Sequence, residues 1–238
     1  MTELLFRDDP YLRSCDATVR GVNDRGGIIL DRTVFYAASG GQPGDSGSLR
    51  FIDGSEIRIA TTVKGETPDE IVHVPASLDV LAEPARHVEA EIDWERRHRL
   101  MRIHTCMHLL SVLVPYPVTG GQVADDYGRL DFDVGDGALD KEELTAHLNE
   151  MIAADHPVSA EWISDEELAA RPEMVKTMTV KPPIGAGQVR LIRIGDVDLQ
   201  PCGGTHVHST AEIGPVVVSR IESKGARNRR VRIAFAGE

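Results

Sequence analysis

Four residues in two pairs carry the clearest chemistry in this sequence. His104 and His108 are four residues apart in a stretch without glycine or proline, so a helix would place both imidazoles on one face. Cys202 and His206 have the same spacing, but the two glycines between them favour a tight turn over a helix. Three nitrogens and one sulfur make a tetrahedral set that suits Zn2+. The sequence therefore predicts a zinc site at these four residues.

The role of the predicted metal stays open at this stage. Four protein ligands are typical of a closed structural site, whereas a catalytic site keeps one position for water or substrate. If His206 were displaceable, a bound water could be activated toward neutral pKa. The spacing of the ligands is compatible with both roles.

Composition limits the classes of protein that could hold this site. The chain has 238 residues, of which 41% are hydrophobic and 27% are charged, as in ordinary soluble domains. No apolar run approaches the roughly 20 residues of a membrane span, the start lacks the pattern of a signal peptide, and three scattered cysteines do not make a disulfide framework. We therefore expect a cytoplasmic protein. The net charge of −12 argues against indiscriminate nucleic-acid binding but allows a local basic patch.

The elements that would position the ligands fall into two parts, and the fold class is predicted to be α+β. Residues 1–92 hold short apolar runs at 26–31, 47–53 and 56–63, with turns at the spacing of roughly 8–12 residues that is typical of small barrels. This part is predicted to be a small β-barrel domain that carries a glycine-rich motif.

Residues 93–238 have a different pattern, which predicts a zinc-binding two-layer domain with an antiparallel sheet. Apolar residues at helical spacing predict a helix from Trp94 to about Val114. Asp140, with Glu143 three residues later, predicts the start of a second helix. Strands are expected at 129–134, 158–163, 189–194 and 214–221, without the alternation of a parallel sheet.

The two ligand pairs, together with the segment from Thr33 to Gly47, resemble the editing domain of alanyl-tRNA synthetase. The closest resemblance is to the free-standing alanyl-tRNA editing proteins of the AlaX family, medium type, over about residues 24–235. Ala37 and the Cys106-Met107 pair depart from the family pattern, and neither is a proposed ligand. The resemblance implies a zinc-dependent deacylase that acts in trans on tRNA(Ala) mischarged with serine, or with glycine.

The resemblance also implies roles for single residues. The Thr33 hydroxyl would hydrogen-bond the hydroxyl of serine, and Gln122 would lie in the editing pocket. Gly40 and Gly41 would let the backbone approach the 3′ end of the tRNA. Each residue also has an alternative interpretation without a functional role. Thr33 would be an ordinary strand residue, Gln122 a polar loop residue, and Gly40 and Gly41 a β-turn between strands.

Cationic residues gather at 94–102 and at 220–232, where six of thirteen residues are cationic. Near the predicted site, Lys224, Arg229 and Arg230 are candidates for contacts with tRNA phosphates. A solvated charged face is the usual alternative. The histidines without a partner pattern are expected at the surface: His73, His87, His147 and His156.

Two other functions remain possible from the sequence. One is a non-catalytic tRNA-binding module with a structural zinc. The other is a deacylase of the threonyl type, which shares the histidine and cysteine frame, although the segment Gly40-Gly41-Gln42 favours the alanyl branch. The sequence leaves the oligomeric state open.

Overall fold

The structure is a computed structural model, and it describes residues 2–67, 70–77, 82–171, 174–175 and 187–237. The chain divides into two compact units, Met1–His98 and Arg99–Glu238, and helix α1 (Trp94–Leu113) runs across the division. The unit boundary falls inside this helix, so the predicted division into domains 1–92 and 93–238 stays a prediction.

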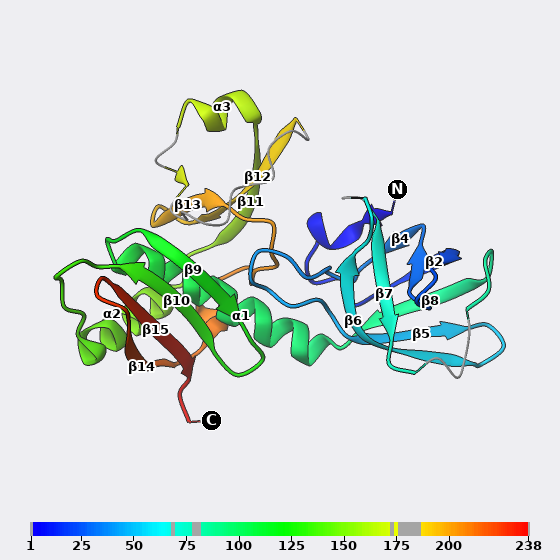
Figure 1. The fold of residues 1–238 in the computed structure, drawn as a ribbon, viewed down its shortest axis with the longest axis horizontal. Helices are drawn as coiled ribbons and strands as arrows, with labels where there is room; N and C mark the ends of the chain where they lie inside the picture. Colours follow the sequence, from blue (N-terminus) through cyan, green and yellow to red (C-terminus); the bar gives the residue numbers. More distant parts are fainter. Residues whose placement is uncertain (1, 68–69, 78–81, 172–173, 176–186, 238) are drawn as a thin grey trace. The chain divides into compact units, whose positions relative to one another are not determined.

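The N-terminal unit is a closed barrel with the strand order β2-β3-β7-β6-β5-β8 (Figure 1). Alternating residues along each strand turn apolar side chains inward, and Leu30, Leu49 and Ala90 are fully buried. A short parallel pair, β1 with β4, lies outside this ring. The elements are β1 (Glu3–Leu4), η1 (Leu5–Arg7), β2 (Ser14–Val22), β3 (Ile28–Leu30), β4 (Arg32–Thr33), β5 (Gly47–Phe51), β6 (Glu56–Lys64), β7 (Ile71–Pro75) and β8 (His87–Ile92).

A buried ion pair anchors the segment that carries the two glycines of the motif. The Arg97 guanidinium is fully buried and donates to both carboxylate oxygens of Asp45 and to the carbonyl of Val34. Asp45 also accepts from the backbone N–H of Tyr36 at 2.6 Å. Because a buried charge needs a partner, this network ties both ends of the segment 34–45 to the first turn of α1.

The C-terminal unit contains a four-stranded antiparallel sheet with the order β14-β15-β10-β9 and a three-stranded sheet with the order β11-β12-β13. Helices α1 and α2 cover one face of the larger sheet (Figure 1). A Cβ added at Gly128 would lie 2.7 Å from Ile103, which shows how closely α1 packs there. The elements are β9 (Val118–Val123), β10 (Gly128–Asp133), α2 (Lys141–Ala153), β11 (Val158–Ser164), α3 (Asp165–Ala169), β12 (Gln188–Ile194), β13 (Asp198–Pro201), η3 (Thr210–Ile213), β14 (Val216–Lys224) and β15 (Asn228–Phe235).

The predicted α+β class, with a small barrel and an antiparallel sheet beside helices, is confirmed. Helix α1 has the predicted bounds within a residue, and the carboxylate of Asp140 caps α2 by accepting from Glu143 N at 2.8 Å. Within the described ranges, no helix combines the length and apolar character that crossing a bilayer requires.

Candidate functional site

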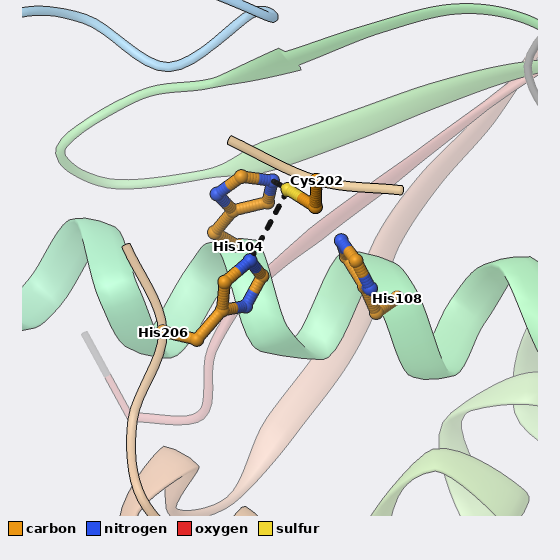
Figure 2. Close-up of side chains that lie close together, drawn as sticks. All are labelled: His104, His108, Cys202 and His206. Carbon is orange, nitrogen blue, oxygen red and sulfur yellow. Dashed lines mark hydrogen bonds between the residues drawn. The ribbon is translucent and has the colours of Figure 1, made fainter. Parts of the chain in front are cut away.

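The four predicted ligands converge in the C-terminal unit (Figure 2). His104 and His108 project from α1, whereas Cys202 and His206 come from the segment after β13. One ligand atom from each residue lies within 4.8 Å of all the others. Cys202 Sγ is 3.5 Å from His104 Nε2 and 3.3 Å from His206 Nε2. Tetrahedral zinc, with bonds of about 2.0 Å to nitrogen and 2.3 Å to sulfur, needs a nitrogen–sulfur separation of about 3.6 Å, so the four residues could hold a metal ion.

The site is shielded from solvent, and its cysteine is prepared to bind a cation. All three histidines are buried, and Cys202 is partly buried. Burial raises the pKa of the Cys202 thiol, but the charges of His104 and His206 outweigh it, so that the pKa falls well below its usual range. The thiolate is the form that binds metals. Cys106, between the helical histidines, lies instead in the core, where desolvation raises its pKa to about 12.

Thr105 fixes the orientation of the His206 ring. Its hydroxyl donates to the carbonyl of Met101 at 2.9 Å, so its oxygen is left to accept from His206 Nδ1, which lies 3.0 Å away. A proton on Nδ1 leaves Nε2 as the metal-facing lone pair. The fully buried Thr105 therefore selects the tautomer that can bind an ion.

Asp198 plays the corresponding part for His108. Its Oδ2 lies 3.3 Å from His108 Nδ1 and accepts a hydrogen bond of 2.6 Å from Gln200 Nε2. Burial lowers the pKa of His108, but the contacts with Asp198 and Cys202 outweigh it and raise the pKa to about 9. The buried carboxylate thus favours a proton on Nδ1 and directs Nε2 toward the other ligands.

Arg190 holds the irregular segment that carries Cys202. Its Nη1 donates to the carbonyl of Cys202 at 3.1 Å and to that of Gly204 at 2.9 Å. The sequence predicted no role for Thr105, Asp198 or Arg190. Thr105 lies inside the predicted ligand helix and Asp198 lies four residues before Cys202, whereas Arg190 reaches the site through the pairing of β12 with β13.

Thr33 lies in the N-terminal unit and is fully buried, and the expectation that His73 lies at the surface is wrong. His73 is also fully buried, because β7 turns it into the barrel. Its Nδ1 lies 3.0 Å from the carbonyl of Ile28, which can only accept, so Nδ1 carries the proton. The Thr33 hydroxyl therefore donates to His73 Nε2 at 2.8 Å, and its oxygen accepts from Phe35 N at 3.0 Å.

The other predicted pocket residues lie at accessible positions. Gly40 and Gly41 form the tip of a turn in which Ser39 and Gln42 exchange two backbone hydrogen bonds. Both glycines have positive φ, of 57° and 86°, and both are exposed. In the C-terminal unit, the half-buried Gln122 on β9 accepts from Arg129 Nε at 2.9 Å.

The three candidates for phosphate contacts lie on two faces of the larger sheet. Lys224 and Arg230 project from the face opposite the helices, and Arg230 donates to both oxygens of Asp131 at 2.7 Å. Arg229 is paired with the buried Phe132 and belongs to the opposite face. The hydrogen bonds from Arg230 hold the pKa of the Asp131 carboxyl below its usual value.

Comparisons with known proteins match both units. Residues 13–96 match the family model for tRNA synthetases class II (A), and residues 189–232 match that for the threonyl and alanyl tRNA synthetase second additional domain. An alanine–tRNA ligase of Pyrococcus abyssi is 33% identical over 93% of this chain, which covers 24% of that protein.

Free-standing proteins match this chain as well. The alanyl-tRNA editing protein AlaX-M of Methanosarcina acetivorans is 34% identical over 97% of this chain and 98% of its own. The AlaX-L protein of Pyrococcus horikoshii is 36% identical over 97% of this chain and 57% of its own. With the converging histidine and cysteine side chains, these matches place the chain in the family of alanyl-tRNA editing proteins.

Proposed function

We propose that this protein is a zinc-dependent aminoacyl-tRNA deacylase that hydrolyses the ester of tRNA(Ala) mischarged with serine, acting in trans in the cytoplasm. The observation that carries the proposal is the buried set of three imidazoles and one thiolate in a chain whose relatives are named alanyl-tRNA editing proteins. Serine is the proposed amino acid, with glycine as a second substrate.

The donor set favours zinc over harder cations. Imidazole and thiolate suit zinc, whereas magnesium and calcium prefer oxygen ligands. When bound, zinc supplies a Lewis acid that can polarise an ester carbonyl or a water. His104, His108, Cys202 and His206 would hold the ion. Gln122 would contact the aminoacyl end, and the exposed turn at Gly40 and Gly41 would approach the terminal nucleotide.

A second function has a specific observation in its favour. Four protein ligands fill a tetrahedral shell, as in structural zinc sites, and a non-catalytic tRNA-binding module would need nothing more. Such a module would bind tRNA(Ala) and zinc without turnover. A deacylase of the threonyl type is less well supported, because the relatives reported above are named for alanyl-tRNA.

Serine specificity requires a polar group, because alanine is smaller than serine and cannot be excluded by size. A site that hydrogen-bonds a hydroxyl can reject the analogue without it by roughly 10⁴-fold. We propose Thr33 for this role. Its oxygen accepts from Phe35 N and so keeps one lone pair, and the bond to His73 fixes the direction of its own proton.

A deacylation assay decides among these functions. Purified protein would be incubated with Ser-tRNA(Ala), Gly-tRNA(Ala), Ala-tRNA(Ala) and Ser-tRNA(Thr), with Cys202→Ala as the metal-deficient control. The proposal expects rapid loss of serine from Ser-tRNA(Ala), slower loss of glycine and no loss of alanine. Zinc-loaded protein that binds tRNA(Ala) and hydrolyses none of the four would establish the binding module.

A further inference from the structure

In the described part of the C-terminal unit, helices cover only one face of the larger sheet, and the other face is rich in arginine. Pairing partners in adjacent strands project their side chains from the same face. On the covered face lie apolar residues such as Leu130 and Val231, and alternation sends their neighbours outward. The outward residues on β10, β14 and β15 include five cations and three acids: Arg129, Arg220, Lys224, Arg230, Arg232, Asp131, Asp133 and Glu222.

A β-bulge creates this pattern on β14. Val218 is buried and pairs with the buried Ile233, so strict alternation would also turn Arg220 toward the core. The register shifts between Val218 and Arg220, with the exposed Ser219 as the extra residue. Arg220 and the alternate residues after it, up to Lys224, therefore project from the open face.

Three arginines form one row across the open face. Arg220 on β14 pairs with Arg232 on β15, and Arg232 pairs with Arg129 on β10. Adjacent strands are about 4.8 Å apart, so the three side chains start side by side. Arg129 pairs in turn with Gln122 on β9 and donates to its amide oxygen at 2.9 Å. The arginine row (Arg220, Arg232, Arg129) thus ends at Gln122, on the face of the sheet opposite α1 and its two histidines.

The acids near the row neutralise only part of its charge. Asp131 contacts both Arg129 and Arg230, and Glu222 contacts both Arg220 and Arg232, at 2.7–3.7 Å. Each of these two acids is therefore shared by two cations. Like charges directly opposite each other destabilise a sheet, so a row of three arginines is a costly way to build a solvated face. The excess charge lies on a protein whose net charge is −12.

We propose that the arginine row binds consecutive phosphates of the tRNA acceptor end, with the chain of phosphates crossing the strands toward Gln122. Guanidinium groups match phosphate oxygens in a bidentate geometry. The side chains of Arg220, Arg232 and Arg129 are 67%, 36% and 22% exposed, so they would exchange their carboxylate contacts for phosphate oxygens. This inference rests on the proposed function, because the arginine row would hold the tRNA substrate of the deacylase. It also replaces Arg229 by Arg220 as a phosphate contact.

The test measures binding of deacylated tRNA(Ala) transcript by fluorescence anisotropy between 50 and 200 mM salt. Arg220 has a side chain that is 67% exposed, so Arg220→Gln leaves the fold intact and removes one phosphate contact. The slope of log K against log salt should then flatten by ~0.7–0.9. The loss of affinity over this fourfold salt range should consequently shrink by about threefold. Arg220→Lys keeps the charge and should keep the slope.

Arg229→Gln is the matched control, because it removes the same charge three residue pairs along the β14–β15 ladder and on the opposite face. It should leave the slope unchanged, as should Arg50→Gln on the barrel. Equal slopes for wild type and Arg220→Gln, or equal flattening by Arg220→Gln and Arg229→Gln, would overturn the proposal. An Arg220→Gln protein that loses binding to an acidic peptide and not to the transcript would assign the row to a protein partner.

The experiments distinguish an error in the proposed phosphate-binding surface from an error in the proposed function. If Ser-tRNA(Ala) is hydrolysed while the slope of Arg220→Gln is unchanged, the deacylase stands and the row is only a solvated face. If the slope flattens while no aminoacyl-tRNA is hydrolysed, the row binds RNA and the deacylase is wrong.

Discussion

The contact between Asp198 and His108 makes a quantitative prediction about metal affinity. Outer contacts of this kind typically change metal affinity by roughly 10–100-fold, or about 1.4–2.7 kcal/mol. Asp198→Asn keeps an oxygen that can accept from His108 Nδ1 and removes the negative charge, so we expect about a tenfold loss of zinc affinity. Asp198→Ala removes charge and acceptor together, so we expect a loss near 100-fold.

The assay is competition for zinc with a chromophoric chelator, supported by the absorption spectrum of the cobalt-substituted protein. Cobalt should report a tetrahedral site in wild type and a weaker or altered spectrum in Asp198→Ala. Asp140→Asn is the matched control, because it makes the same chemical change at the N-cap of α2, where Asn serves as well as Asp.

If the Asp198 variants merely destabilised the fold, the result would differ from that expected when the orientation of the His108 ring is lost. If Asp198 only supported the fold, thermal unfolding would shift in both variants while zinc affinity at 25 °C stayed at the wild-type value. Equal zinc affinity in wild type, Asp198→Asn and Asp198→Ala would refute the argument that this carboxylate orients His108.

Three further predictions follow from the same structure. Purified protein should contain about one zinc per chain, and His104→Ala or Cys202→Ala should lower that content; full zinc in both variants would reject the four-ligand site. Thr33→Val should slow hydrolysis of Ser-tRNA(Ala) by up to about tenfold, whereas Thr33→Ser keeps the hydroxyl and should keep the rate. Equal rates for Thr33→Val and wild type would show that Thr33 does not determine the specificity. Desolvation, opposed by the hydrogen bond to Ile28, lowers the pKa of His73 to about 4. As pH falls from about 6.5 to 4, His73 is therefore protonated in the unfolded chain but stays neutral in the folded one. The free energy of unfolding should drop by about 3 kcal/mol over this range because of His73 alone. Chemical denaturation across this pH range should show a smaller drop in the free energy of unfolding for His73→Gln than for wild type. Parallel pH profiles of the two proteins would contradict the argument that buried His73 is neutral.

Local periodicity was enough to predict the features that depend on neighbouring residues. A four-residue spacing places two side chains on one face of any helix, so His104 and His108 were predictable as a pair. The cap of α2 was predictable for the same reason, because the Asp140 carboxylate accepts from the backbone N–H of Glu143 within one turn. Glycines between Cys202 and His206 likewise disfavour a helix, and residues 202–207 form neither helix nor strand.

Only the tertiary structure decided the features that depend on strand register. Nothing in the sequence near His73 indicates that β7 faces it into the barrel toward Thr33, because either face of a short strand can be buried. Asp198 on β13 meets His108 on α1 only through the packing of two elements that lie far apart in the chain. The arginine row depends on one extra residue in β14. Because a shift of one residue exchanges the two faces of a strand, the bulge at Ser219 determines that Arg220 faces outward, and no local pattern specifies it.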